Sequence, residues 1–333
     1  MTKPKVAFYW CASCGGCEEA VVDLAEGVLD VVAAVDICFW PCAMDFKRED
    51  VEKMADGEID ACFLNGAIRS TEQQEMAHLM RRKSKVMIAF GSCAQAGGIP
   101  SLANLSTKAE VLHAAYDTTP STVNPDKTRP ETAHHVNGHQ TTLPDLFENV
   151  DMLSQHVDVD YYLPGCPPTP KLLAAAVTAM LSGTLPPKGT VLAPNIALCE
   201  DCPRKETKPE SLAITEWKRP HLHAIDPEKC ILAQGFPCLG SSTRSGCDAQ
   251  CIRGNMPCTG CFGPVDQVSD QGAKALSALA SSVGSNDEAE IEKIMAGIPD
   301  PAGTFYRYGL AGSLLHHKRR PGSGPAPLEE EKA

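Results

Sequence analysis

KVAFYWCASCGGCEE, residues 5–19, decides the fold, because a short apolar strand runs directly into a loop rich in glycine and cysteine. The same order of strand and loop returns further along the chain. KVMIAF at 85–90 leads into GSC, and DVDYYL at 158–163 leads into PGC. Helix-like stretches lie between the strands, as at 18–32 and 171–181. Short apolar strands that alternate with helices predict βαβ units and a parallel sheet covered on both faces.

Two further apolar runs complete this pattern. VDICFW at 35–40 and DACFLN at 60–65 have the length and composition of buried strands. The stretch at 71–85 has helical periodicity, with Thr71 as the candidate N-cap and basic residues at its end. We therefore predict a flavodoxin-like α/β domain over residues 1–187.

The pattern changes beyond this region. Strand–helix alternation fades, and eight cysteines fall within residues 199–261. We predict an irregular, mostly helical domain over 188–320, held together by metal centres because apolar runs are few. PGSGPAPLEEEKA at 321–333 has the composition of a disordered tail, and residues 105–150 read as a long surface insertion.

Charge and hydropathy exclude two classes of protein. The 333 residues include 30 Lys and Arg against 42 Asp and Glu, a net charge of −12, which argues against a nucleic-acid binder. The sequence contains no run of ~18 apolar residues, which is the length that a membrane-spanning helix needs. The first residues, MTKPKVAFYW, show neither a signal peptide nor a twin-arginine pair, so we expect a cytoplasmic protein.

The 16 cysteines are the most informative feature of the composition. Cytosolic thiols stay reduced, so this density favours metal ligands over disulfides. Cys14, Cys17, Cys93 and Cys166 each lie in a glycine-containing loop directly after a predicted strand. Ligands of an open α/β sheet bind at the carboxyl ends of its strands, where these loops converge. The sequence therefore predicts one metal centre there, with glycine allowing the backbone to approach it closely.

The remaining candidate ligands form a second, C-terminal set. Its members are Cys199, Cys202, Cys230, Cys238, Cys247, Cys251, Cys258 and Cys261. Eight thiols fit two four-thiolate sites, and CxxC pairs suit either tetrahedral zinc or an iron–sulfur cube. Spacing alone does not separate these readings. Three sites in one chain favour an electron relay, since a scaffold rarely needs three metals.

Motifs along nearly the whole chain resemble the small subunit of cytoplasmic [NiFe] hydrogenases of the F420-non-reducing, methyl-viologen-reducing type. They are WCASCGGCEEAVVDLAE, FWPCAMDFK, NGAIR, FGSCAQAGGIP, TRPET, VDYYLPGCPPTP, LCEDCPR, TRSGCDAQC, MPCTGCFGP and IPDPAGTFYRYGL. The resemblance implies three [4Fe–4S] clusters in this chain and a Ni–Fe site in a separate large subunit. This chain would then transfer electrons and not itself activate hydrogen.

The resemblance also assigns the cysteines to clusters. The proximal ligands would be Cys14, Cys17, Cys93 and Cys166. The distal ligands would be Cys199, Cys202, Cys230 and Cys238, with Cys199 in place of the histidine of the related HxxCPR motif. The medial ligands would be Cys247, Cys251, Cys258 and Cys261. The division of the last eight is less fixed than their role as ligands.

Partners follow from the same resemblance. They are the [NiFe] large subunit, a small [2Fe–2S] electron-transfer subunit and a heterodisulfide reductase. Two other functions stay open. The proximal module is also similar to a complex I subunit, so the chain fits an iron–sulfur subunit of a non-hydrogenase oxidoreductase. A zinc-stapled structural protein is the second alternative.

Four cysteines lie outside this assignment. Cys11 precedes the CxxC and competes with it for the proximal centre, although only Cys14 and Cys17 have the family's spacing to glutamate. Cys38 and Cys62 lie within apolar strands and read as core thiols. Cys42 follows a strand end and reads as a loop thiol.

Other candidates are weaker. Glu18 follows the CxxC, where it would either move protons or stabilise a helix N-terminus. His221 and His223 read as surface or core histidines, because four cysteines are available nearby. Residues 316–320, HHKRR, read as a solvated basic run or a docking contact for an acidic partner.

Overall fold

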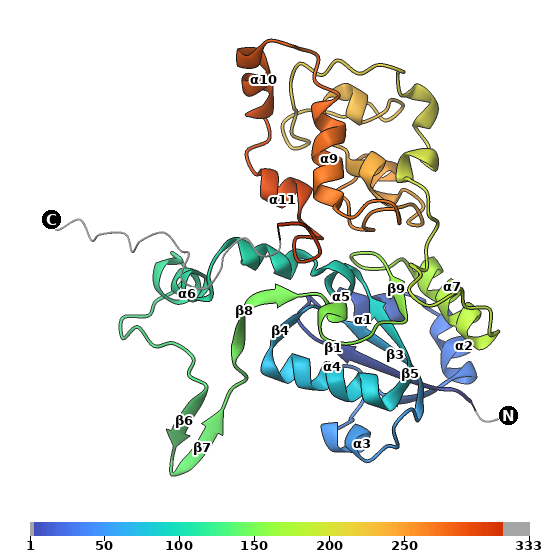
Figure 1. The fold of residues 1–333 in the computed structure, drawn as a ribbon, viewed down its shortest axis with the longest axis vertical. Coiled ribbons are helices and arrows are strands. Elements are labelled where there is room, and N and C mark those ends of the chain that lie inside the picture. The colour runs from blue at the N-terminus through green and yellow to red at the C-terminus, as the bar shows by residue number, and fades with distance from the viewer. Residues whose placement is uncertain (1–2, 316–333) are drawn as a thin grey trace.

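The computed structural model describes residues 3–315 and has two regions (Figure 1). A layered α/β region carries the N-terminal half of the chain, and a region of short helices and long loops stands on one edge of it. No helix among residues 3–315 is long and apolar enough to cross a membrane. The predicted boundary at 187 stays a prediction, and the predicted tail lies outside the described residues.

The core of the α/β region is a five-stranded sheet in which every neighbouring pair is parallel. Its order is β2-β1-β3-β5-β9, with β1 at Lys5–Trp10, β2 at Asp36–Phe39, β3 at Ile59–Asn65, β5 at Ser84–Phe90 and β9 at Tyr161–Leu163. Numbered along the sheet strands alone, this is the order 2-1-3-4-5 of flavodoxin-like folds. The predicted fold class is confirmed.

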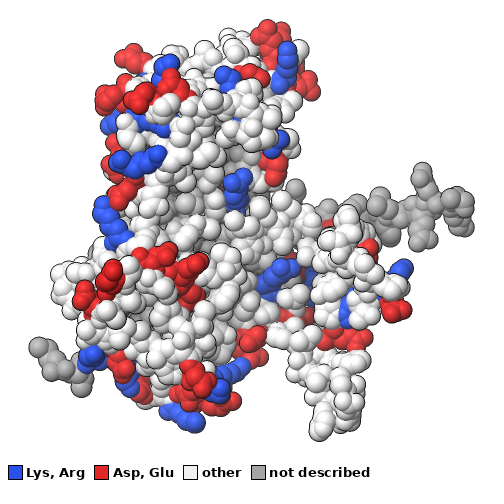
Figure 2. All heavy atoms as spheres, turned by 180° about the vertical axis from the view of Figure 1, so that it is seen from behind, with Lys and Arg blue, Asp and Glu red and all other residues white. Residues whose placement is uncertain are grey.

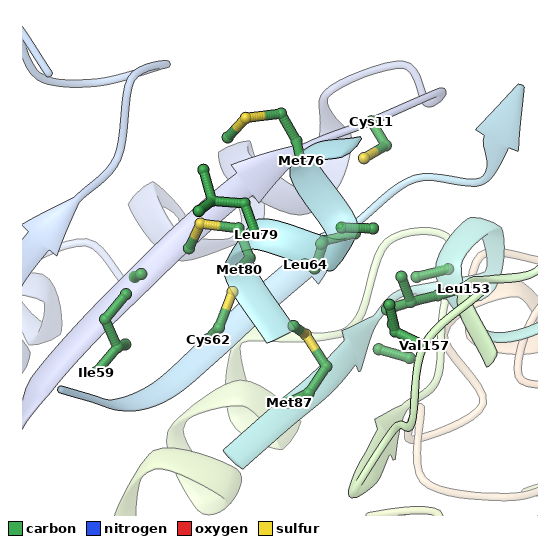
Figure 3. Close-up of a cluster of buried hydrophobic side chains, with 14 of the residues drawn as sticks. Cys11, Ile59, Cys62, Leu64, Met76, Leu79, Met80, Met87, Leu153 and Val157 are labelled. Carbon is green, nitrogen blue, oxygen red and sulfur yellow. The ribbon is translucent and has the colours of Figure 1, made fainter. Parts of the chain in front are cut away.

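Both faces of this sheet are buried, which explains why its strands read as continuous apolar runs. On one face the rings of Phe8, Phe63 and Phe90 pack together. The other face carries Cys62 and Met87, which belong to one buried cluster (Figure 3). Such burial stabilises by roughly 25 cal/mol for each Å² of apolar surface removed from water.

Helices cover the two faces. On the Phe8 face lie α1 (Gly16–Val22) and α7 (Pro170–Leu181). On the Cys62 face lies α4 (Thr71–Lys83), through Met76 and Met80. The remaining helices here are α2 (Gly27–Ala34), α3 (Arg48–Glu52) and α5 (Ser92–Ala96).

Two details differ from the sequence prediction. The single helix expected at 18–32 is broken into α1 and α2, because Ala25 adopts a left-handed φ of 52°. The N-cap of α4 is Ser70, whose hydroxyl accepts the Gln73 N–H, and not Thr71.

The expected insertion at 105–150 has structure of its own. It follows η1 (Ile99–Leu105) and contains α6 (Lys108–His113), a π-helical turn η2 (Ala114–Thr118) and a hairpin of β6 (Ala133–Val136) and β7 (His139–Thr142). Every residue of these two strands is exposed, and the hairpin projects from the body (Figure 1). Strand β8 (Leu146–Asp151) then pairs antiparallel with β4 (Ile68–Ser70), and η3 (Leu153–Gln155) follows.

The C-terminal region is irregular, as predicted. Its helices are α8 (Gln250–Arg253), α9 (Gln271–Ala280), α10 (Glu288–Met295) and α11 (Pro301–Phe305), with 3-10 turns η4 (Leu198–Glu200), η5 (Lys205–Thr207), η6 (Leu232–Gln234) and η7 (Leu239–Ser242). Trp217, Phe236 and Phe305 belong to an apolar cluster of its own. Scattered apolar residues therefore give this cysteine-rich region a hydrophobic core of its own, which the scarcity of apolar runs in the sequence did not predict.

Candidate metal centres

The first thiol group forms at the carboxyl edge of the sheet, where the loops after β1, β5 and β9 meet. Burial raises the pKa of the Cys17 thiol, and the nearby Cys93, Cys166 and Cys14 raise it further. Burial also raises the pKa of Cys93 to about 12, with Cys166 and Cys14 contributing. The four cysteines predicted for one centre therefore lie together.

Two glycines leave room for this group. Gly91 has φ of +84°, and a Cβ added to it would overlap the Cys17 sulfur. Gly98 has φ of +57°, and a Cβ there would overlap the Cys93 sulfur. A side chain at either position would fill the space beside a thiol, so glycine serves both backbone conformation and close approach.

Glu18 ties the Cys14–Cys17 loop to the sheet. Its side chain is 4% exposed and accepts hydrogen bonds from Trp40 Nε1 and Asn65 Nδ2. Ser13 Oγ donates to Asn65 Oδ1 at 2.7 Å, and Gly15 N–H donates to Ser13 Oγ at 3.3 Å. Burial raises the pKa of Glu18, and the two donors oppose that rise. The glutamate is thus a buried anchor of the loop, a role that the sequence prediction missed.

The second group lies at the junction of the two regions. Cys247, Cys251, Cys258 and Cys261 line one cavity of ≈ 220 Å³, together with Cys166 of the first group. Burial raises the pKa of Cys247, whereas the N–H groups of Ala249 and Gln250 lower it. Main-chain donors therefore favour the thiolate form that a metal requires.

The third group lies further into the C-terminal region and contains Cys199, Cys202, Cys230 and Cys238. Burial raises the pKa of Cys199 to about 12, and the nearby Cys238 raises it further. Cys202 and Cys230 also lie close enough to contribute. A Cβ added to Gly240 would lie 3.3 Å from the Cys199 sulfur, so this thiol too has little room beside it.

Direct contacts connect the three groups in series. The N–H of Cys166, in the first group, lowers the pKa of Cys261 by hydrogen bonding, although burial raises it overall to about 12. Ser92 Oγ donates to the Cys261 carbonyl at 2.5 Å. The N–H of Cys258, in the second group, donates to Cys238 Sγ of the third at 3.3 Å. The second group therefore lies between the other two.

The donor set of each group suits an iron–sulfur cluster. Each contains four thiols, and burial keeps most of them protonated unless a metal replaces the proton. Thiolates are the ligands that [4Fe–4S] clusters take. Within residues 3–315, no three His, Cys, Asp or Glu side chains are arranged to hold a single metal ion.

The other cysteines lie apart from these groups. Cys11 is buried on the Cys62 side of the sheet (Figure 3), which favours Cys14 and Cys17 for the first group. Cys38 donates a hydrogen bond to the Val6 carbonyl, and burial raises its pKa to about 11. Cys42 is exposed in the loop after β2.

The two candidate histidines lie at the surface. His221 and His223 are both exposed, which agrees with their reading as surface residues. The basic run at 316–320 lies outside the described residues.

A parallel α/β sheet with thiols at its carboxyl edge, continued into a cysteine-rich region, defines a member of the iron–sulfur oxidoreductase class. The family model described as NADH ubiquinone oxidoreductase, 20 Kd subunit, matches residues 14–180. The F420-non-reducing hydrogenase iron–sulfur subunit of Archaeoglobus profundus is 37% identical over 317 residues, covering 94% of this chain and 98% of that protein. The corresponding F420-non-reducing hydrogenase vhu subunit of Methanocaldococcus jannaschii is 36% identical, covering 95% and 98%.

The same fold occurs in a [NiFeSe] hydrogenase of Desulfovibrio vulgaris Hildenborough. The superposition has a TM-score of 0.51 at 16% identity and covers 80% of this chain and 95% of that one. The chain belongs to the family of F420-non-reducing hydrogenase iron–sulfur subunits, and it is a hydrogenase small subunit. Its role is electron transfer, and this membership implies a large-subunit partner. The family resemblance found in the sequence is confirmed.

Proposed function

We propose that this subunit relays electrons from hydrogen oxidation in the large subunit, through three [4Fe–4S] clusters, to an acceptor linked to heterodisulfide reductase. The observation that carries the proposal is the series of three four-cysteine groups, joined at Cys166–Cys261 and at Cys258–Cys238. Contiguous groups fit an electron relay better than separate structural staples. The proximal, medial and distal clusters correspond to the first, second and third groups.

Each cluster would carry one electron at a time, at a potential set by its ligands, hydrogen bonds and exposure. The protein supplies the rest. The Trp40–Glu18–Asn65 contacts hold the first loop in place. Gly91 and Gly98 keep side chains away from its thiols. Main-chain N–H groups at Cys247 and Cys238 stabilise negative charge on sulfur.

Electrons would enter at the first group, where Cys14 is exposed in the loop after β1 and Trp10 is exposed at the end of that strand. Figure 2 shows acidic and basic side chains scattered over the face seen from behind, with uncharged side chains between them. The loop around Cys14, residues 11–16, carries no charged side chain. Interface cores are depleted of charge, so the surface of this loop suits a large-subunit partner. The exit partner is a small [2Fe–2S] protein, which the family resemblance supports.

We place the assembly in the cytoplasm. All sixteen cysteines are unpaired by disulfides. A reducing compartment maintains thiols in that state and keeps them available to iron.

The ligand at position 199 offers a first prediction. Cys199→His would replace one of four thiolates by a neutral imidazole, so the distal cluster would lose negative charge. We expect a higher distal midpoint potential, with the other two unchanged. An EPR-monitored redox titration of the hydrogenase complex measures all three. An unchanged distal midpoint would remove Cys199 from the ligand set.

Metal analysis of the native complex tests the function itself. The complex is purified anaerobically, and Fe, Ni and Zn are measured per copy of this chain. Three cubes require about twelve irons in this chain, with nickel in the large subunit. The same iron without nickel would support the complex I-like alternative. Zinc in place of iron would support the structural alternative and overturn the relay.

A further inference from the structure

Arg204 is a buried cation that bonds almost entirely to the main chain. The residue is only 7% exposed. One guanidinium nitrogen donates to the carbonyls of Asp226 and Lys229, each at 3.3 Å. The other donates to the Ile252 carbonyl at 3.1 Å and to Asn255 Oδ1 at 2.8 Å. All four acceptors are formally neutral.

No carboxylate within residues 3–315 forms an ion pair with Arg204. The nearby Asp226 carboxylate pairs instead with Lys229 Nζ at 2.9 Å. Lys229 chiefly, and Arg204 to a lesser extent, hold the pKa of the Asp226 carboxyl below its usual range, so Arg204 only shares this carboxylate at a distance. Arg244, the other arginine buried within residues 3–315, is 1% exposed and does pair with a carboxylate, that of Asp266. A buried charge without a paired counter-ion is costly, so further negative charge nearby would stabilise Arg204.

The surroundings of Arg204 identify the source of that charge. The main-chain N–H of Arg204 donates to Cys202 Sγ at 3.4 Å. Its guanidinium donates to the carbonyl of Lys229, which immediately precedes Cys230, so the residue is tied to the third group on one side. Ile252 immediately follows Cys251, so the other side reaches the second group. The guanidinium therefore connects the loops of two thiol groups.

We propose that Arg204 is a positioning residue that also raises the electron affinity of the medial and distal clusters. The inference rests on the proposed function, because four thiolates around a [4Fe–4S] core leave a net negative charge. Each added electron increases that charge and strengthens its attraction to the cation. In a buried setting this attraction is weakly screened. One side chain thus raises the midpoint potentials of both the medial and the distal cluster.

The test is a redox titration of the intact complex, monitored by EPR, with variants that separate charge from shape. Arg204→Gln removes the cation, and we expect the medial and distal midpoints to fall together. The equilibrium constant for adding an electron should drop about tenfold, which is ~59 mV for one electron. Arg204→Lys keeps the charge and should leave both midpoints near wild type. The proximal midpoint is the internal reference.

Lys208 supplies a matched control. Lys208 is exposed, although it lies close enough to Cys199 to lower the pKa of that thiol. Lys208→Gln also removes one positive charge, but solvent screens this charge, so its effect on the midpoints should be much smaller. An equal shift in Lys208→Gln and Arg204→Gln would show that net charge alone matters and overturn the role of the buried arginine.

A second variant covers the case in which Arg204→Gln fails to fold. Asn255→Asp keeps the size of the side chain and places a carboxylate 2.8 Å from the guanidinium. It neutralises Arg204 in place and should lower both midpoints. Unchanged midpoints in Asn255→Asp, with all clusters loaded, would refute the inference and leave the relay intact. Absence of reducible [4Fe–4S] signals in the wild type would instead refute the proposed function.

Discussion

Gly91→Ala is expected to prevent assembly of the proximal cluster. Gly91 has φ of +84°, so any side chain there carries a conformational cost of about 1 kcal/mol. The added Cβ would also overlap the Cys17 sulfur, and it would lie 3.4 Å from the Gly165 carbonyl oxygen. Overpacking of this kind costs a further ~1–3 kcal/mol, or it displaces the thiol from its position. We expect about a third of the iron to be lost, measured per purified copy of this chain.

Gly189→Ala separates the clash from the backbone strain. Gly189 has nearly the same φ, +89°, but a Cβ added there meets no heavy atom within 4 Å. The control should lose about 1 kcal/mol of stability and keep all its iron. Equal iron loss in the two variants would show that the left-handed backbone, and not the space beside Cys17, is what the site requires.

The sheet was predictable because its strands are buried on both faces and end at conspicuous loops. For that reason β3 contains the apolar run ACFL at 61–64, and β5 contains VMIAF at 86–90. The small β4–β8 sheet was missed, since β4 has only three residues and its partner lies far along the chain. The break between α1 and α2 depends on the left-handed backbone of Ala25. Alanine rarely adopts this conformation, so the sequence did not predict the break.

The thiol groups were predictable to different degrees. Strand topology alone brings the ends of β1, β5 and β9 together, so the first group follows from the alternation of strands and helices. The division of the other eight cysteines came from the family resemblance, because irregular loops carry no periodic signal. The contacts of Arg204 depend on how such loops pack. The role of Asn65 beside Glu18 could have been suspected from the sequence, because this polar residue directly follows the apolar run ACFL of β3.

Arg244→Met is expected to destabilise the junction between the two regions strongly. The guanidinium donates to the Pro264 carbonyl at 3.1 Å and to those of Ala193 and Pro194 at 3.4 Å each, and it pairs with Asp266. Methionine keeps much of the apolar volume but leaves these carbonyls without donors. Each orphaned buried acceptor costs ~1–3 kcal/mol, so a total loss of about 3 kcal/mol or more is expected. Asp266 is itself half exposed and becomes hydrated, so it adds little.

The measurement for Arg244→Met is the thermal midpoint of the complex, followed by circular dichroism. The entropy of unfolding is about 2.1 cal/mol/K per residue, so in a chain of 333 residues a loss of ~3 kcal/mol lowers that midpoint by roughly 4 °C. Arg253→Met is the matched control, because Arg253 is exposed and its side chain, within residues 3–315, donates only to the Asp248 carbonyl, at 2.9 Å. Its stability should stay within about 0.5 kcal/mol of wild type. Equal thermal midpoints for the two variants would mean that packing alone holds the segment at Ala193 and Pro194 in place. The buried Arg244 guanidinium would then contribute no net stability.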